Sequence, residues 1–252
     1  MGDVSPRLTA RIAGGLYLIV IVTAGFAEVF VRGRVIVSGA GASTVANILA
    51  HDSLYRLGGS ADLVNLVCDT ALALLFYELF KTVSRSLSLL AAFFRLMHVA
   101  VLAVSTLYHF APLIILRTAN QTGGFSAEQL QAQTLVSLRL HSLGYNFSLV
   151  FFGISCMLLG YLIYRSGFLP RIFGVLMATA GLCYVVNSFA VFLLPEFASR
   201  LLPWILLPGL PAEWGLTLWL LVIGVNARRW NELAVAAARV TTLDTNHPKV
   251  CE

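Results

Sequence analysis

Residues 57–80 read LGGSADLVNLVCDTALALLFYELF, a stretch that is long and apolar enough to cross a membrane but carries Asp62 and Asp69. The next such stretch, residues 87–110, carries Arg95 and His98. About 20 apolar residues in a helix span the hydrocarbon core of a bilayer. A charged side chain at that depth costs about 3 kcal/mol even on lenient insertion scales, so such side chains face a bundle interior and are paired. These four residues therefore indicate the interior of a membrane protein.

The composition of the whole chain also indicates a membrane protein. Of its 252 residues, 58% are hydrophobic and 12% are charged, and the mean hydropathy is +0.84. Soluble domains carry about 25% charged residues, and a chain of this size could not bury so much apolar surface in water. The pI near 9.2 is explained by basic residues that flank the spans and face anionic lipid. The lipid bilayer is the expected partner, and no nucleic acid is expected to bind.

Apolar stretches of about 20 residues predict an all-α fold, a polytopic transmembrane helix bundle of about six spans. The predicted spans are 11–31, 57–80, 87–112, 142–164, 172–194 and 210–227. Residues 1–230 are expected to form a single transmembrane helical domain. Residues 231–252 are expected to form a cytoplasmic tail, helical through the Ala-rich 234–239 and partly disordered. The first span is expected to be a retained signal anchor, because its apolar run is longer than that of a cleaved signal peptide.

The distribution of Lys and Arg predicts the orientation, because cytoplasmic loops are enriched in these residues. Both termini are expected in the cytoplasm, and the expected location is the bacterial cytoplasmic (inner) membrane. The basic residues on the N-terminal side of the spans are Arg7, Arg11, Lys81, Arg85, Arg165, Arg171, Arg228, Arg229, Arg239 and Lys249. Those on the opposite side are fewer: Arg32, Arg34, Arg56, Arg117, Arg139 and Arg200.

The segments between the spans carry local signals of structure. A short helix is expected at 42–51. Ser126, followed three residues later by Gln129, is a capping box. It predicts a helix from Ala127 to about Leu140 that lies against the fourth span or runs into it.

The stretch 195–211 is apolar but rich in proline and too short to span, so an interfacial or re-entrant segment is expected there. Trp204 and Trp214 are expected at the level of the headgroups. The prolines also leave the start of the last span undefined. Within the fourth span, Gly153 and Gly160 are expected to allow close helix packing.

A polar site is expected inside the bundle, made of Asp62, Asn65, Asp69, Arg95 and His98. The first three are spaced i, i+3, i+7 and share one helical face. The connection 81–86 is short, so the second and third spans are antiparallel neighbours. At 1.5 Å rise per residue, Asp69 lies about 17 Å from the cytoplasmic end, Arg95 about 12 Å and His98 about 16 Å. Asp69 is therefore expected to meet Arg95 or His98.

Two interpretations of this polar site stay open. In one, an ion pair fixes the register of the helices and has no further role. In the other, the site is a proton or ion relay or a buried binding site, with Asp69 as its titratable member.

A second polar cluster is expected near the outer face, from Glu28, Asp62, His109, His141 and Tyr145. Glu28 lies about 25 Å and Asp62 about 27 Å along their spans, and the two histidines flank the outer ends of theirs. Glu28, Asp62, His109 and His141 are candidate ligands for a divalent metal. No HxxH or HExxH pair is present, so hydrogen bonding to water or headgroups is the alternative. No cofactor is predicted apart from this metal, and no catalytic residue is assigned.

Several segments together resemble one family. They are RIAGGLYLI (11–19), AEVFVR (27–32), LLAAFFRL (89–96), HSLGYN (141–146), GYLIYRSGFLPR (160–171) and WLLVIGV (219–225). The chain resembles, over about residues 7–230, a bacterial inner-membrane family defined only as domain of unknown function 4386. The resemblance implies a six- or seven-helix integral membrane protein, and it implies no reaction.

Three classes of function follow as expectations. The first is small-molecule or ion binding, or transport, through the polar intramembrane site. The second is an intramembrane metal-dependent enzyme, hydrolase-like, with the outer carboxylate and histidine site. The third is a structural or regulatory partner of another membrane protein. A small-molecule or ion ligand and a homo-oligomer remain open as partners.

Overall fold

The computed structural model describes residues 5–37, 39–122 and 124–245, which contain helices and no strand. Six segments in this part of the chain are long and apolar enough to cross a membrane, so the chain is a multi-pass membrane protein, as predicted. The first span, Pro6–Val35, is built from α1 (Pro6–Gly25), the π-helix η1 (Phe26–Arg32) and α2 (Gly33–Val35). The next four are α4 (Asp52–Phe80), α5 (Arg85–Thr122), α6 (Ala127–Ser166) and α7 (Arg171–Leu193).

The last membrane-length segment is Trp204–Val222. It contains the short 3-10 helix η2 (Trp204–Leu206) and α9 (Gly209–Val222). The remaining helices are α3 (Gly41–Ala50), α8 (Pro195–Leu201) and α10 (Ala227–Thr245).

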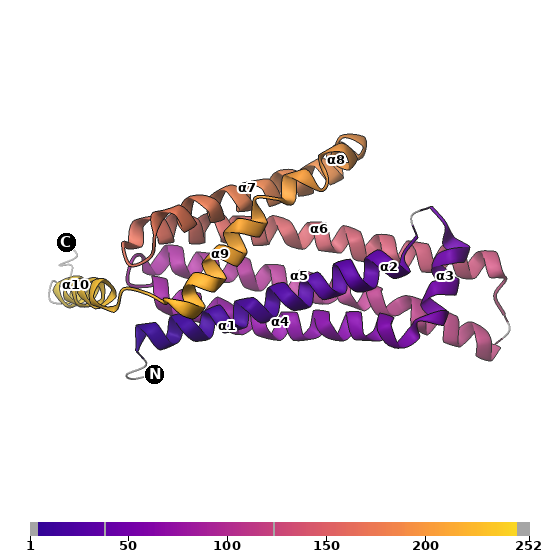
Figure 1. Ribbon diagram of the computed structural model, residues 1–252, viewed down its shortest axis with the longest axis horizontal. Coiled ribbons are helices and arrows are strands. Elements are labelled where there is room, and N and C mark those ends of the chain that lie inside the picture. Colours follow the sequence, from indigo (N-terminus) through magenta and orange to yellow (C-terminus); the bar gives the residue numbers. More distant parts are fainter. Residues whose placement is uncertain (1–4, 38, 123, 246–252) are drawn as a thin grey trace, which may run out of the picture.

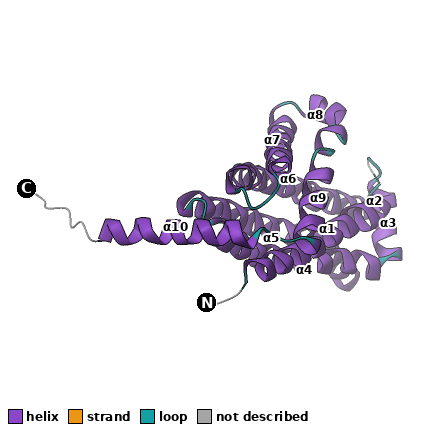
Figure 2. Cartoon of the chain, turned by 60° about the vertical axis from the view of Figure 1, so that its left-hand side comes forward, coloured by secondary structure: helices purple, strands orange, loops and turns teal. Residues whose placement is uncertain are grey.

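Four of the spans, α1, α4, α5 and α6, run side by side along the long axis of the molecule (Figure 1). Helix α7 packs against α6, and α9 crosses between α7 and α1. The start of α1 and helix α10 lie at the same end of the bundle (Figure 1), as an even number of spans requires. Figure 2 shows α10 extending away from that end, whereas α3 packs against α4 and α6 at the opposite end.

The start and the end of helix α6 are determined by local sequence signals. The Ser126 Oγ accepts a hydrogen bond from the Gln129 amide at 3.2 Å, and the Gln129 side chain accepts one from the Ser126 amide at 2.9 Å. The predicted capping box is confirmed. The helix then continues for 40 residues, about 60 Å, until Gly167 adopts a left-handed φ of 66°. The helix predicted from Ala127 and the fourth span are therefore one helix.

The boundaries of other elements differ from the predictions in places. The short helix expected at 42–51 is α3, Gly41–Ala50. The last span was expected to continue to residue 227, but α9 ends at Val222 because Gly224 takes a left-handed φ of 76° and α10 begins at Ala227. The stretch expected to be interfacial or re-entrant holds α8 and η2. Of the predicted disordered tail, residues 246–252 lie outside the described residues.

Close packing of α6 on α7 depends on four glycines. A Cβ atom on Gly153 would lie 2.6 Å from the Gly181 carbonyl oxygen, and one on Gly160 would lie 2.6 Å from the Gly174 carbonyl oxygen. Small residues at such positions let membrane helices approach closely. The predicted packing role of Gly153 and Gly160 is confirmed.

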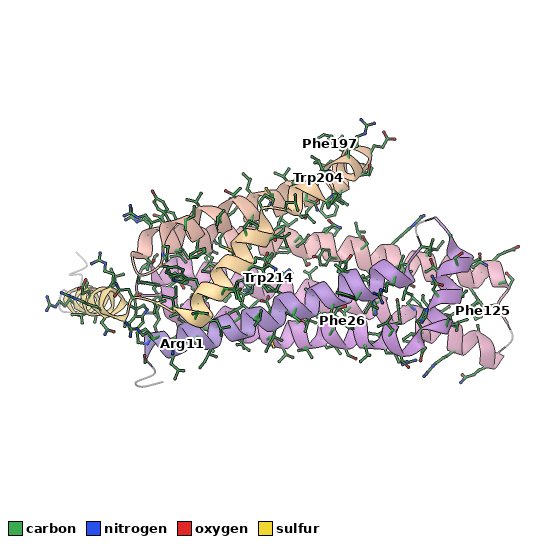
Figure 3. The ribbon with its side chains drawn as sticks, viewed as in Figure 1. Arg11, Phe26, Phe125, Phe197, Trp204 and Trp214 are labelled. Carbon is green, nitrogen blue, oxygen red and sulfur yellow. The ribbon has the colours of Figure 1, made fainter. Side chains whose placement is uncertain are left out.

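Along the helices, a polar layer separates two apolar clusters. In α4, Tyr55 belongs to one cluster and Leu72 to the other, and Asp62, Asn65 and Asp69 lie between them. In α5 and α6 the same order holds, with the histidines between the apolar clusters. Large apolar side chains cover the outer faces of the bundle (Figure 3), Trp204 and Trp214 among them. Lipid therefore faces apolar surface, and the polar groups gather inside.

Candidate functional site

A cavity of about 170 Å³ lies in the polar layer, and all six spans contribute to its lining. Its apolar lining includes Leu102, Leu149 and Phe152. Its polar lining residues are Glu28, Arg32, Asp62, Asn65, Asp69, His98, Tyr145, Tyr184 and Glu213. The cavity therefore combines residues from the two polar clusters that the sequence predicted separately.

The predicted intramembrane ion pair forms between Asp69 and Arg95. Arg95 Nε and Nη2 donate to Asp69 Oδ1 at 2.8 and 2.5 Å, and the Arg95 and Asp69 side chains are 2% and 1% exposed. The rings of Tyr17, Phe76 and Phe152 lie 5.2–5.5 Å from the guanidinium carbon. Aromatic faces attract cations at such distances. Arg95 is thus enclosed by aromatic rings and is not part of the cavity lining, whereas its partner Asp69 is.

The second oxygen of Asp69 is an unsatisfied acceptor within the part of the chain that the structure describes. Oδ2 is buried and has no hydrogen-bond partner among the described residues, although Asp69 lines the cavity. An ionised carboxylate offers about four acceptor positions. A buried acceptor left unsatisfied costs about 1–3 kcal/mol, and more when charged. A hydrogen-bond donor that reaches this oxygen would therefore remove that cost.

The other two residues of the predicted intramembrane site bond to backbone. Asn65 Nδ2 donates to the Val20 carbonyl at 2.8 Å and so joins α4 to α1. His98 Nδ1 lies 3.1 Å from the Ser148 carbonyl, which can only accept, so this nitrogen carries the proton. The expectation that Asp69 meets Arg95 or His98 is resolved in favour of Arg95.

Arg32 is the largest correction to the sequence interpretation, which placed it in the loop beyond the first span. It lies in η1 and is 8% exposed. Its Nη1 and Nη2 donate to Asp62 at 2.8 and 3.3 Å, and its Nε donates to Glu28 at 2.7 Å. A π-helix brings residues four to five apart onto one face, and such turns are frequent at functional sites. Glu28, 61% exposed, lies at the margin of the cavity.

Two further cavity residues, Tyr184 and Glu213, were not predicted. The Tyr184 hydroxyl donates to Glu213 Oε1 at 2.5 Å. Gly209 makes room for this contact, because a Cβ atom there would lie 2.0 Å from the Tyr184 oxygen. Glu213 stands alone between Pro211 and an apolar run. A single acidic residue beside an apolar run could have identified Glu213 as a candidate site residue. It was missed because the start of the last span was not defined by the sequence.

The lining of the cavity has more carboxylates than guanidinium groups. Four of its side chains are carboxylates, Glu28, Asp62, Asp69 and Glu213, whereas Arg32 is the guanidinium in its lining. Adding Arg95 behind Asp69 gives two positive against four negative formal charges. Carboxylates only accept hydrogen bonds when ionised, so this arrangement favours a positively charged donor as ligand.

Of the predicted outer cluster, three members come together. Asp62, His109 and His141 are buried and each offers a ligand atom within 4.8 Å of the other two. Glu28 is not part of this group and is connected to it through Arg32 and Asp62. Tyr145 lines the cavity instead.

Comparisons with known proteins agree with the resemblance noted in the sequence. The model of a family described as a domain of unknown function, DUF4386, matches residues 12–224. An uncharacterised protein of the archaeon Archaeoglobus fulgidus is 29% identical over 122 residues. The matched region is 48% of this chain and 59% of the archaeal protein, so the chain covers less than two thirds of that relative. No solved structure matches.

Proposed function

Because the chain belongs to DUF4386, a family of unknown function, we propose its function from the chemistry of the cavity: the protein binds a small organic cation within its membrane domain. The observation that carries this proposal is the unpartnered, buried Oδ2 atom of Asp69, a residue that lines a cavity with more carboxylates than cationic groups. A protonated amine supplies both a positive charge and N–H donors to such an oxygen.

The size of the cavity supports an organic ligand. Its volume of about 170 Å³ resembles that of an engineered 150 Å³ protein cavity that binds benzene. Phe152, Tyr145 and Tyr184 contribute aromatic rings to the lining, and aromatic rings bind ammonium groups. A ligand of about five non-hydrogen atoms therefore fits in volume and in chemistry.

The apolar clusters on either side of the polar layer support binding in preference to open conduction. Side chains such as Leu72 and Phe76 fill the bundle toward the end that carries α10, and Ile48 and Leu116 fill it toward α3. A hydrated ion would have to cross both apolar clusters along the helix axes. Any transport would need a second conformation that opens one of them.

We propose further that the chain lies in the bacterial cytoplasmic membrane with both termini in the cytoplasm. The excess of Lys and Arg at the end that carries the termini supports this orientation. A C-terminal fusion to a fluorescent protein that folds only in the cytoplasm should fluoresce in bacterial cells. A dark but stably produced fusion contradicts the orientation.

Three probes of similar size test the proposed ligand on the purified protein in mild detergent. n-Butylammonium, n-butanol and butyrate differ at one end only, so the comparison isolates charge. We expect butylammonium alone to raise the thermal melting temperature with a saturating dose dependence. An equal effect of butanol would show that the cavity selects apolar volume, and stabilisation by butyrate would contradict the charge argument.

A further inference from the structure

The contacts of the two outer histidines show which ring nitrogens are free. His109 Nε2 lies 3.0 Å from the Tyr55 carbonyl oxygen, which can only accept, so Nε2 carries the proton. The Nδ1 atom of His109 has no hydrogen-bond partner among the described residues, and the side chain is 0% exposed. A neutral imidazole with a proton on Nε2 has its lone pair on Nδ1. His109 therefore presents a buried, unused lone pair.

His141 has the same arrangement through its other nitrogen. Its Nδ1 lies 2.9 Å from the Ser105 carbonyl oxygen, so Nδ1 is the donor and Nε2 carries the lone pair. In both cases, the residue whose carbonyl accepts from the imidazole also donates a hydrogen bond from its hydroxyl to the backbone carbonyl of that histidine. The Ser105 hydroxyl donates to the His141 carbonyl at 2.7 Å, and the Tyr55 hydroxyl donates to the His109 carbonyl at 2.7 Å.

These backbone bonds are typical of metal-binding histidines. A ligating imidazole commonly donates its other N–H to a backbone carbonyl or carboxylate, which fixes the tautomer and the ring orientation. The Tyr55 ring, stacked at 4.2 Å on that of His109, restricts the ring further. Two imidazoles on α5 and α6 are thus held with one free lone pair each, and Asp62 on α4 completes a group whose ligand atoms lie within 4.8 Å.

Asp62 can bind a cation while it keeps its salt bridge. Arg32 occupies one acceptor position on each carboxylate oxygen, and an ionised carboxylate has about four positions in all. A carboxylate that binds a metal usually also accepts a hydrogen bond from a residue that does not bind the metal. Arg32 is that hydrogen-bond donor to Asp62. Since Arg32 also contacts Glu28, the two carboxylates offset its charge.

We propose that Asp62, His109 and His141 form a binding site for a divalent transition-metal ion, with Zn²⁺ as the best match. Two imidazoles and one carboxylate suit Zn²⁺ and other divalent ions of the first transition row, whereas Mg²⁺ and Ca²⁺ prefer oxygen ligands. In a tetrahedral zinc site the ligand atoms lie about 3.4 Å apart, so small side-chain rotations close the site. Three protein ligands leave a fourth position for water or another ligand. The site shares Asp62 with the cavity, but none of the contacts that support it involves the proposed organic cation.

The test measures metal directly on protein from which any affinity tag has been removed. After removal of metal by EDTA, the protein in mild detergent is loaded with Zn²⁺ and separated from free ion by gel filtration. We expect one zinc per chain by elemental analysis, a rise in melting temperature, and the visible spectrum of tetrahedral Co²⁺ when cobalt replaces zinc. Wild-type protein that retains no zinc overturns the proposal whatever any variant does.

Histidine variants locate the ion. His109→Gln and His141→Gln should each weaken zinc binding at least tenfold. His98→Gln is the matched control, because His98 is also buried and also bonds through Nδ1 to a backbone carbonyl, but lies outside the cluster. Zinc that remains stoichiometric in the His109→Gln/His141→Gln double variant, or that is lost equally in His98→Gln, identifies an adventitious ion only and overturns the assignment.

Discussion

Arg32 of the first span and Asp62 of the second form a two-point salt bridge inside the bundle, with N–O distances of 2.8 and 3.3 Å. The same guanidinium contacts Glu28 at 2.7 Å. One arginine thus connects η1 to α4, lines the cavity, and binds Asp62, which also belongs to the cluster with His109 and His141.

Replacing Arg32 should therefore destabilise the fold. Arg32→Gln leaves Asp62 as an uncompensated buried charge, and removal of one partner of a buried pair costs about 3–5 kcal/mol. Arg34→Gln is the control, because Arg34 is exposed two residues away, and surface substitutions change stability by about 0.5 kcal/mol or less. Denaturant unfolding in detergent measures both. Equal unfolding midpoints for the two variants contradict the buried pair.

The Asp69–Arg95 pair should show strong coupling in a double-mutant cycle. Asp69→Asn and Arg95→Met should each cost about 3–5 kcal/mol, because each leaves the other charge buried and unpaired. The double variant should recover part of that loss, since it removes both charges. The free energy of unfolding of the four proteins gives the coupling energy. Strictly additive losses would show that the two side chains do not act as a pair.

Two glycine substitutions should have opposite effects. Gly160→Ala places a methyl group 2.6 Å from the Gly174 carbonyl and should destabilise by about 1–3 kcal/mol through overpacking of α6 on α7. Gly25→Ala places its methyl group where no atom lies within 4 Å, and it restricts the unfolded chain, so a gain of about 0.4–1 kcal/mol is expected. The melting temperature of each variant is compared with that of the wild-type protein in the same detergent. A stabilising Gly160→Ala contradicts the close contact.

The spans and the Asp69–Arg95 pair could be predicted because each depends on local quantities. Length and hydropathy set the spans, and rise per residue along two antiparallel helices places Asp69 and Arg95 within side-chain reach. The same depth argument brought Asp62, His109 and His141 to one level, and the structure places them together. Which of the polar residues touch, however, depends on helix rotation and long-range packing.

Arg32 and Glu213 show where the sequence is ambiguous. A basic side chain after an apolar run can extend outward to the lipid headgroups or point into the bundle. The presence of a buried carboxylate such as Asp62 in the neighbouring helix decides which of these positions it takes. The π-helical turn that aims Arg32 inward has no periodicity visible in one sequence. Glu213 reaches the cavity because α9 crosses between α7 and α1 (Figure 1), and this tilt follows from packing rather than from composition.

The central claim is that the carboxylates of the cavity bind a small organic cation, and Glu213 gives its most direct test. Glu213→Gln keeps an oxygen to accept the Tyr184 hydrogen bond but removes the charge, so the fold should persist. Equilibrium dialysis of radiolabelled n-butylammonium against wild-type protein, Glu213→Gln and the exposed control Glu128→Gln measures the dissociation constants. We expect saturable binding to wild type and to Glu128→Gln. Binding to Glu213→Gln should be about 10- to 100-fold weaker if Glu213 acts beside Asp69 as a second acceptor for the ammonium group, the loss typical of one charged hydrogen bond. Unchanged binding to Glu213→Gln, or no saturable binding to wild type, would contradict the account.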